Sequence, residues 1–594
     1  MWTADFETTT DEDDCRVWAY AFCNIETYEF IYGNSIEEFF SICEHSKTNM
    51  KVFFHNLKFD GSFLLSFLFA NSYEYIEDKK EKRDHTFSTL ITDMGQFYEI
   101  EVYFKVKGKK VKKVTFQDSM KIFPNQSVAD VAKGFGLSIS KLEIDYKAKR
   151  EVGHVLTQQE IDYIRNDVEI MARALHAMFE QGLKKMTIAS DAMNNYKETI
   201  VGFRKKFPQL PEEIDKSIRA SYRGGFTYVN EIYKEKEVGK GITLDVNSLY
   251  PSILRYCLLP YDFPVRFEGK YEEDEVYPLF IQNFTCVFEL KEGKIPTVQI
   301  KNSFSFIPNE YLKSSKDEIV ALTLTSVDFK LFMENYNVRH IKYAGGWKFK
   351  QARGLFNQYV DYWTEKKIKA GKEGNKSLRS IAKLMQNSLY GRFSLSPTAR
   401  QKAPYLDEDG VVRYKLLPEE KREPVYIPIG SFVTAWGRDK IIRTAQAIRD
   451  FTLKKYGVDK YFYTDTDSLH VDLTDEDLEE LKGIIPIDDF KLGYFAKEAE
   501  FTRAIYIRQK CYIEEINGKL EVVVAGLPKY LAPLITFENF RRGFSTKGLT
   551  LQQMLNLASA NGATEDDIKK LHPKLTYKYV KGGVVLKDTD FTLK

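Results

Sequence analysis

The chain has 594 residues, too many for one hydrophobic core, so roughly three to five domains are expected. Its net charge of +2, from 87 Lys and Arg against 85 Asp and Glu, excludes a uniformly basic protein, so any surface for nucleic acid must be local. The six cysteines lack CxxC or zinc-finger spacing, which predicts reduced, buried thiols and no structural zinc. No signal peptide or apolar run of membrane-spanning length is found, so we expect a cytosolic protein.

Residues 1–185 are predicted to form an α/β unit. Strands are expected at 2–7, 16–31, 51–54, 87–104 and 113–118. The lysines between 105 and 113 predict a hairpin with a charged tip. Thr157 and Glu160 form a capping box, and apolar residues then recur at helical spacing until Gly182.

Acidic residues recur in this unit at spacings that favour a shared site. Asp5 and Glu7 lie on one face of the first strand, and Asp60 follows the next apolar strand. Tyr163 and Asp167 are four residues apart and lie on one face of the capped helix. Four acids with a tyrosine suit two-metal hydrolysis of a phosphodiester. Taken singly, each has a simpler explanation, such as a surface strand or helix packing.

A second acidic set is expected farther along the chain. A strand is expected at 241–249, followed by Pro251, and it places Asp245 near its end. Asp465 and Asp467 share one face of a strand or tight hairpin, where a Mg²⁺ or Mn²⁺ ion would relieve their repulsion. Asp-Thr-Asp is also ordinary turn chemistry, and 222 residues separate Asp467 from Asp245, so their proximity is a prediction.

A helix at about 375–390 presents Arg379, Lys383, Asn387 and Tyr390 on one polar face. It lies in a basic region, because residues 341–402 hold 14 Lys and Arg against three acids. Such a face suits a triphosphate, and the alternative is an ordinary solvated helix face. Two short amphipathic helices are expected within 545–573.

These segments jointly resemble family B DNA polymerases. Residues 245–252, 387–391 and 463–468 resemble motifs A, B and C in family order, and the acids of residues 1–185 resemble the DEDD exonucleases of the tyrosine subtype. The resemblance covers nearly the whole chain and is strongest to the protein-primed enzymes of small tailed phages. Supporting segments are Tyr222-Arg223-Gly224-Gly225-Phe226, Thr434-Ala435-Trp436-Gly437-Arg438, Lys510-Cys511-Tyr512, Thr536-Phe537-Glu538-Asn539-Phe540 and Gly582-Gly583-Val584-Val585-Leu586.

The resemblance implies an α/β multidomain fold, with a ribonuclease H-like exonuclease followed by a right hand of palm, fingers and thumb. The expected parts are the exonuclease at 1–185, the palm at 186–256 and 428–528, the fingers at 355–394 and the thumb at 529–594. Two insertions are expected: 257–354, which would dock a terminal protein, and 395–427, which would encircle DNA for processivity and strand displacement.

The resemblance also implies site residues. The polymerase metals would be held by Asp245, Asp467 and the Val246 carbonyl, with Asp465 as a further catalytic residue. The incoming nucleotide would contact Tyr250, Arg379, Lys383, Asn387, Tyr390 and one of Lys367 and Lys369. The exonuclease metals would be held by Asp5, Glu7, Asp60 and Asp167, assisted by Tyr163 and Lys141.

DNA contacts follow from the same resemblance. Single-stranded DNA would contact His55, Asn56, Phe59, Phe63, Ser119 and Met120; the template Tyr222, Arg223, Gly224 and Gly225; and the primer end Lys510 and Tyr512. Arg379 and Met120 stand where lysine and leucine are usual in the family, and residues 545–573 exceed its short thumb.

The expected function is template-directed DNA synthesis with 3′–5′ proofreading, initiated on a terminal protein, with two Mg²⁺ or Mn²⁺ ions in each site and dNTPs as substrates. Primer-template and single-stranded DNA are the expected partners of a monomer in the cytoplasm of a bacterial host. Two alternatives remain: an RNA- or DNA-primed polymerase without a terminal protein, and a DNA-binding relative without catalytic activity.

Overall fold

An eight-stranded mixed sheet organises the N-terminal part of the chain, in the order β3-β2-β1-β4-β8-β7-β6-β5. The computed structural model describes residues 1–145, 148–300 and 310–594. The strands are β1 Trp2–Thr8, β2 Val17–Asn24, β3 Phe30–Gly33, β4 Met50–Phe54, β5 Glu74–Tyr75, β6 Thr86–Ile91, β7 Phe97–Lys107 and β8 Lys110–Asp118. Strand β1 pairs in parallel with β4, and β4 in parallel with β8, so the centre of the sheet is parallel.

The predicted strands 16–31 and 87–104 each prove to be two strands. The Asn24 side chain accepts hydrogen bonds from the amides of Glu26 and Thr27, which turns the chain between β2 and β3. Gly95, with φ of +72°, turns the chain between β6 and β7. The lysine-tipped hairpin is confirmed as β7–β8, with Gly108 in its turn at φ of +58°.

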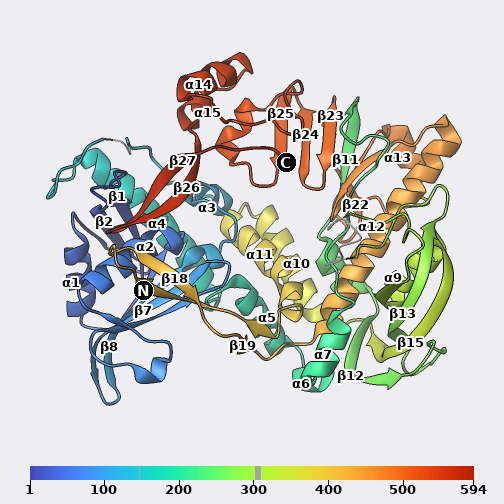
Figure 1. Cartoon of the computed structure of the whole chain (residues 1–594), viewed down its shortest axis with the longest axis horizontal. Coiled ribbons are helices and arrows are strands. Elements are labelled where there is room, and N and C mark those ends of the chain that lie inside the picture. Colours follow the sequence, from blue (N-terminus) through green and yellow to red (C-terminus); the bar gives the residue numbers. More distant parts are fainter. Residues whose placement is uncertain (146–147, 301–309) are drawn as a thin grey trace.

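Helices cover this sheet (Figure 1). They are α1 Ile36–His45, α2 Leu57–Ala70, α3 Val128–Phe135 and α4 Gln158–Glu180, followed by α5 Ile188–Thr199, α6 Phe203–Lys206 and α7 Glu212–Arg219. The capping box of Thr157 and Glu160 is confirmed at the start of α4. Gly182 follows the end of that helix with φ of +76°.

A five-stranded antiparallel sheet, in the order β22-β11-β21-β20-β9, lies on the other side of the molecule (Figure 1). Its strands are β9 Thr227–Val229, β11 Gly241–Val246, β20 Tyr461–Asp465, β21 Ser468–Val471 and β22 Phe495–Phe501. The predicted strand 241–249 is too long, because helix α8 (Leu249–Tyr256) begins inside it. Pro251 lies in the first turn of α8, where a missing amide proton costs no helix hydrogen bond.

Long helix α12 (Ile427–Tyr456) and the pair α10 (Asn357–Lys372) and α11 (Lys376–Phe393) pack with this sheet around one core. The helix predicted at 375–390 is therefore confirmed and is slightly longer. A separate four-stranded sheet contains β12 Leu259–Phe267, β13 Leu279–Leu290, β14 Val320–Thr325 and β15 Tyr336–Ala352, with α9 Ser326–Asn335. Within the predicted segments, residues 146–147 of 1–185 and 301–309 of 257–354 lie outside the described residues.

The C-terminal part adds a four-stranded sheet, two short helices and a hairpin. The sheet joins β10 Glu237–Val238, from the middle of the chain, to β23 Ala504–Arg508, β24 Cys511–Ile516 and β25 Lys519–Val524. The helices are α14 Leu551–Ala560 and α15 Glu565–Lys570, and the hairpin is β26 Lys574–Val580 with β27 Gly583–Thr589. The remaining elements are β16 Thr398–Ala399, β17 Lys402–Leu406, β18 Val412–Leu416, β19 Glu420–Lys421 and α13 Asp475–Leu481, with short 3₁₀ turns at Lys79–Glu81, Ser119–Lys121 and Lys529–Leu534. Helices α14 and α15 confirm the two predicted within 545–573.

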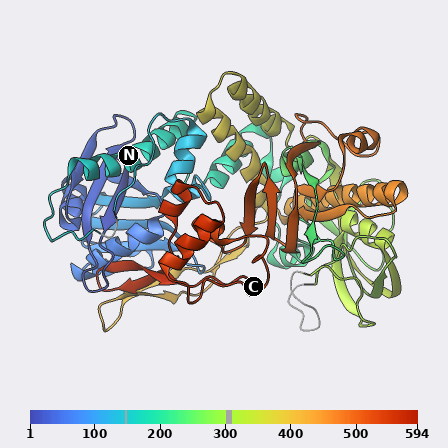
Figure 2. The same ribbon diagram turned by 90° about the horizontal axis from the view of Figure 1, so that it is seen from above.

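The hairpin β26–β27 does not stay with the rest of the C-terminal part. It reaches back to the N-terminal part and lies beside α2, as Figures 1 and 2 show. All six cysteines are free thiols, four of them buried, whereas Cys15 and Cys257 are only half-buried. Among the described residues, no helix is long and apolar enough to span a membrane.

Candidate active sites

Four acids of the N-terminal part, Asp5, Glu7, Asp60 and Asp167, are here called the N-terminal acidic cluster. Strand β1 presents Asp5 and Glu7, the first turn of α2 presents Asp60, and α4 presents Asp167. The Phe6 amide donates to Asp60 Oδ1 at 3.3 Å, which ties α2 to β1. The structure therefore brings together the four acids that the sequence predicted.

Burial and mutual repulsion disfavour the charged forms of these acids. Burial, with Asp167 nearby, raises the pKa of Asp5 to about 7. The pKa of Glu7 is raised well above its ordinary value by burial and by Asp5, and that of Asp60 is raised for the same two reasons. A bound cation would reduce the repulsion between these carboxylates, because it offsets several negative charges at once.

The two carboxylate oxygens of Asp167 have different surroundings. Lys141 Nζ lies 2.7 Å from Asp167 Oδ2 and partly offsets the effect of burial, which raises the pKa of this carboxyl. The other oxygen, Oδ1, is buried and has no hydrogen-bond partner among the described residues. Buried Tyr163 lies one turn before Asp167 on α4, and Lys141 Nζ lies 5.5 Å from its ring centroid. Tyr163 and Lys141 therefore both lie close to Asp167.

The residues predicted to bind single-stranded DNA lie around the N-terminus of α2 and in the 3₁₀ turn Ser119–Lys121. Asn56, at φ of +80°, precedes this helix, and its amide donates to Asp118 Oδ1 at 3.1 Å. His55 bonds Ser119 Oγ through Nδ1 at 2.9 Å, and burial lowers the pKa of this imidazole. The Met120 amide donates to Asp118 Oδ1 at 3.0 Å.

Two of the predicted DNA-binding rings on α2 differ in accessibility. Phe59 is half-buried, but Phe63 is only 1% exposed. A side-chain carbon on Gly583 of β27 would lie 2.5 Å from the Phe63 ring, so the hairpin β26–β27 covers that ring closely. Access of DNA to Phe63 therefore requires movement of this hairpin.

Asp245 and Asp467, here called the central acidic pair, meet on the five-stranded sheet. Asp245 at the end of β11 pairs in register with Ser468, and the next amide, that of Val246, donates to the Asp467 carbonyl at 2.9 Å. Thr466, at φ of +64°, forms the tight turn that separates Asp465 from Asp467. The predicted hairpin and the predicted proximity of residues 222 positions apart are both present.

The central acidic pair, Asp245 and Asp467, has different surroundings from Asp465, the other acid of motif C. Burial, with Asp467 and Glu498 nearby, raises the pKa of Asp245 to about 7, against the opposing charge of Lys383. Burial also raises the pKa of Asp467. Asp465 instead has a positive partner, because Lys510 Nζ lies 3.1 Å from its Oδ1.

The cationic face of α11 points toward this pair. Arg379, Lys383 and Asn387 are exposed on that face, and Tyr390 is half-buried. Lys383 acts on the pKa of Asp245, so its charge lies near the acids. The rings of Tyr250 and Tyr390 pack together with centroids 4.1 Å apart, beside the central acidic pair.

The choice between Lys367 and Lys369 depends on tertiary contacts. Lys367 Nζ contacts Gln386 Oε1 at 3.0 Å and Ser248 Oγ at 3.3 Å. Burial lowers the pKa of Lys367, with Lys383 and Arg379 adding to the shift, so the three cations share one site. Lys369 points away, with its side chain 76% exposed and Nζ 3.9 Å from Glu373.

The predicted template segment 222–225 is held by a buried arginine. Arg438 of α12 donates to the carbonyls of Arg223 and Gly224 at 2.8 and 2.7 Å, and its guanidinium pairs with Asp328 of α9 at 2.7 Å. The Arg223 side chain turns to the Thr323 carbonyl at 2.8 Å.

The two glycines of this segment differ in the space available for a side chain. A side-chain carbon at Gly225 would lie 2.6 Å from Thr466, whereas one at Gly224 would meet nothing within 4 Å. Gly225 therefore permits close packing on the acidic hairpin. Tyr222 is half-buried. It adds to the effect of burial in raising the pKa of Tyr390, which shows that the two phenols lie near each other.

Lys510 and Tyr512, although only two residues apart, do not lie together on one strand face. Lys510 lies in the turn before β24, at φ of +55°, and only Tyr512 is on the strand. The Lys510 amide donates to Tyr463 Oη at 2.9 Å, and the rings of Tyr463 and Tyr512 lie 5.0 Å apart. The turn therefore aims Lys510 at the acidic hairpin, while Tyr512 packs behind it.

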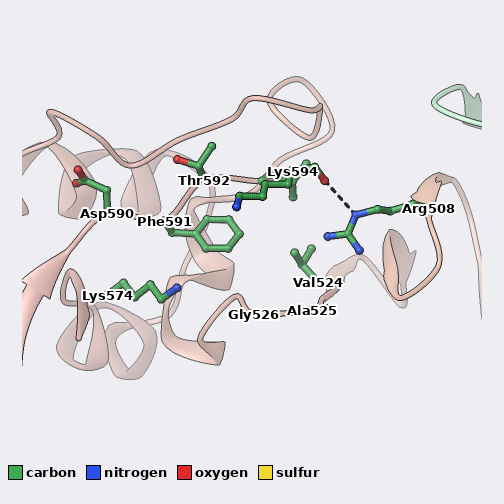
Figure 3. A pocket seen from close by; sticks show the side chains of 10 residues that line it. Arg508, Val524, Ala525, Gly526, Lys574, Asp590, Phe591, Thr592 and Lys594 are labelled. Carbon is green, nitrogen blue, oxygen red and sulfur yellow. Dashed lines mark hydrogen bonds between the residues drawn. The ribbon is translucent and has the colours of Figure 1, made fainter. Parts of the chain in front are cut away.

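A cavity of about 360 Å³ lies near the C-terminus (Figure 3). Cationic side chains contribute to its lining, namely Arg508, Lys574 and Lys594, and Arg508 Nε donates to the Lys594 backbone oxygen at 3.0 Å. The described residues that line it include no acid of either centre. Within the described ranges, no three His, Cys, Asp or Glu side chains are close enough together to hold a metal ion, so the acids of the N-terminal acidic cluster would have to move closer to bind one.

Sequence reasoning missed two acids near these sites. Glu498 lies on β22, opposite an irregularity in its pairing with β11, and it raises the pKa of both Asp245 and Asp467. Asp118 fixes the backbone on either side of the predicted single-strand site. Neither acid belongs to a local motif, so only the register of the strands and the folded turn reveal them.

Known proteins resemble this chain in both sequence and structure. The family model of type B DNA polymerases, organellar and viral, matches residues 42–482. The DNA polymerase of Bacillus phage phi29 is 43% identical, over 100% of this chain and 99% of its own length, and that of Streptococcus phage Cp-1 is 32% identical, over 100% and 98%. A structure of phi29 DNA polymerase complexed with primer-template DNA has a TM-score of 0.88 at 41% identity and covers 100% of both chains.

The matches to the phi29 enzyme extend over the whole chain, so they include the N-terminal sheet as well as the central acidic pair. They confirm the predicted α/β multidomain fold class and the predicted relationship to phage enzymes. The chain belongs to the type B DNA polymerases of organelles and viruses.

Proposed function

We propose that this chain is a template-directed DNA polymerase that also removes nucleotides from a 3′ end. The observation that carries the proposal is the presence of two separate acidic centres. The central acidic pair faces a cationic helix that suits a triphosphate, whereas the N-terminal acidic cluster faces a tyrosine and a lysine. A proofreading polymerase needs one site of each kind.

In the synthetic site, Arg379, Lys383 and Lys367 would neutralise the triphosphate of the dNTP. Tyr250, packed on Tyr390, would lie beneath the sugar and exclude a 2′ hydroxyl. Lys510 would steady the primer end beside Asp465. These residues place the 3′ hydroxyl and the α-phosphate close together, and positioning of this kind supplies much of the catalysis in phosphoryl transfer.

In the hydrolytic site, the Tyr163 hydroxyl would orient the attacking water, and Lys141 would stabilise the charge on the phosphate. His55, Asn56, Phe59, Ser119 and Met120 would guide a single strand to the acids. In this proposal the site takes an unpaired 3′ end, because a base must be unpaired to stack on an aromatic side chain such as Phe59.

Divalent cations fit both sites, because the candidate ligands are hard carboxylate oxygens and Asp167 Oδ1 is buried without a partner among the described residues. Asp245, Asp467 and the Val246 carbonyl would hold Mg²⁺ or Mn²⁺ in the synthetic site, and Asp5, Glu7, Asp60 and Asp167 in the hydrolytic one. When bound, such ions lower the pKa of an attacking hydroxyl or water and stabilise the leaving group.

Initiation on a terminal protein is part of the proposal. Full-length similarity to phage DNA polymerases supports it, with residues 257–354 as the docking region and 395–427 as the clamp around DNA. Phi29 DNA polymerase, a structural relative, is complexed with primer-template DNA and incoming nucleotides, which supports the same partners for this chain. The proposal also has the chain act as a monomer in the cytoplasm of the bacterial host.

Extension of a primer on a single-stranded DNA circle tests the proposal. With Mg²⁺ and four dNTPs, products longer than one circle are expected, because the enzyme displaces the strand ahead. Absence of incorporation would contradict the proposal. A second assay supplies a terminal protein and dNTPs without any primer: a nucleotide joined to the protein supports protein priming, and strict dependence on an RNA or DNA primer contradicts it.

A further inference from the structure

The hairpin β26–β27 is docked on the exonuclease part by several independent contacts. Val584 is fully buried in the same core cluster as Phe63 of α2. Gly582, at φ of +94°, approaches the Cys15 carbonyl too closely for any side chain, and Gly583 does the same against Phe63. Lys578 forms an ion pair with Glu12. The thumb therefore forms one wall of the proposed proofreading site.

Tyr577 is the residue of this hairpin that touches the predicted single-strand site. Asn56 Nδ2 donates to Tyr577 Oη at 3.0 Å. The Tyr577 and Phe59 ring centroids lie 6.0 Å apart, with planes inclined by 56°, and Lys58 Nζ lies 5.2 Å from the Tyr577 ring. These partners lie within four consecutive residues that immediately precede Asp60.

The side chain of Tyr577 is held in place without being enclosed. It is half-buried, so part of this residue remains accessible to solvent. Burial is the main cause that raises its pKa, and Asp60 and Asp118 add to the shift, so the phenol is protonated and close to the acids. A neutral donor and an aromatic face next to Lys58 suit a nucleobase and its phosphate.

We propose that Tyr577 is a DNA-binding residue of the exonuclease, supplied by the thumb. Its ring stacks on a base near the unpaired 3′ end, and its hydroxyl holds the Asn56 side chain in position. This inference rests on the proposed exonuclease function. It adds that the hydrolytic site is complete only when β26–β27 is docked on α2, so a thumb residue governs the capture of single strands.

The test measures degradation of a single-stranded oligonucleotide by the full-length protein with Mg²⁺, over a range of oligonucleotide concentrations. Tyr577→Leu is expected to raise the half-saturating concentration about tenfold with little change in the maximum rate, since stacking on one aromatic ring contributes about 1–3 kcal/mol. Tyr577→Phe keeps the ring and is expected to give a smaller rise. Tyr579→Leu is the matched control, because Tyr579 lies two residues along the same strand but packs on Tyr414.

A double-mutant cycle with Asn56→Ala tests the hydroxyl contact. If the contact orders Asn56, Tyr577→Phe has almost no effect once Asn56 is alanine. Incorporation of a matched dNTP is followed in parallel, because a misfolded variant would lose both reactions. An unchanged half-saturating concentration in Tyr577→Leu, or an equal rise in Tyr579→Leu, overturns the inference. Asp60→Ala separates the two claims: if it retains degradation, the proposed exonuclease site is itself wrong.

Discussion

Lys510 Nζ lies 3.1 Å from Asp465 Oδ1 and thereby joins the turn before β24 to the acidic hairpin of β20 and β21. The Lys510 amide adds a second tie, to Tyr463 Oη at 2.9 Å. Asp465 therefore has a direct positive partner within the protein, whereas Asp467 lies near Asp245 and Glu498, and Lys510 offsets the effect of its surroundings only in part. We expect the two neighbouring acids to have separate tasks, with Asp465 orienting Lys510 and Asp467 holding a metal ion.

Loss of the Lys510 side chain is expected to weaken primer binding. Lys510→Ala should lower incorporation about tenfold at limiting primer-template, because a charge-assisted contact contributes about 1.5–3 kcal/mol. Lys510→Arg should recover part of the loss, since it keeps the charge. Incorporation over a range of DNA concentrations checks this, with exposed Lys519→Ala as control. Equal losses in Lys510→Ala and Lys519→Ala would refute the role of this ion pair.

Lys367 and Lys369 are expected to differ in nucleotide binding. Lys367→Ala should raise the KM for dNTP about tenfold, because Lys367 lies with Lys383 and Arg379 in the proposed triphosphate site. Lys369→Ala should leave the KM within twofold, since its side chain is 76% exposed and points to Glu373. Steady-state incorporation at saturating DNA measures both. The reverse order of effects would contradict this placement.

Arg438 is expected to be important for stability. Arg438→Ala leaves Asp328 and the carbonyls of residues 223 and 224 without their buried donor, which should cost about 3–5 kcal/mol. Arg443→Ala on the same helix is the control, because Arg443 is 43% exposed and its loss should cost at most about 1 kcal/mol. Thermal unfolding compares them. Equal melting temperatures for the two variants would be the contrary result.

Stability is expected to depend on pH and on divalent cations together. Burial raises the pKa of Asp5 and of Asp245 from 3.8 to about 7, so their carboxyls bind protons more tightly in the folded state. Their contribution to stability is therefore present at acidic pH and lost as the pH rises through about 7. In EDTA, the melting temperature should fall between pH 5 and pH 8.

Added Mg²⁺ should raise the melting temperature more at pH 8 than at pH 5, because only ionised carboxylates bind the cation. The double variant Asp5→Asn and Asp245→Asn should respond less to both pH and Mg²⁺. Differential scanning fluorimetry across this pH range, with and without Mg²⁺, provides the measurement. An equal effect of Mg²⁺ at both pH values would argue against cation binding by these acids.

Local patterns predicted the elements that carry most of the site. The capping box at Thr157 marks the start of α4, and the spacing of Arg379, Lys383 and Asn387 gives the polar face of α11. Both signals lie within a few residues of sequence. The strand predicted at 241–249 was too long because its apolar run continues into α8, and periodicity cannot separate a strand from the helix that follows it directly.

Contacts between distant segments could not be predicted. Lys367 and Lys369 have the same local pattern, and only Ser248 and Gln386 distinguish them. Tyr577 and Asn56 are 521 residues apart, and their hydrogen bond depends on the docking of a hairpin. Lys510 has a left-handed backbone conformation that the local sequence does not predict. The proximity of Asp245 to Asp467 was predicted, but no local signal within the intervening chain indicates that β11 and β21 pair.

The central claim is that synthesis and degradation take place at separate acidic centres in one chain. It is tested most directly by assaying Asp467→Ala and Asp60→Ala for dNTP incorporation on a primed template and for degradation of single-stranded DNA. Asp467→Ala is expected to lose incorporation and keep degradation, and Asp60→Ala is expected to do the reverse. If either variant lost both activities while it remained folded, the assignment of two sites would be wrong.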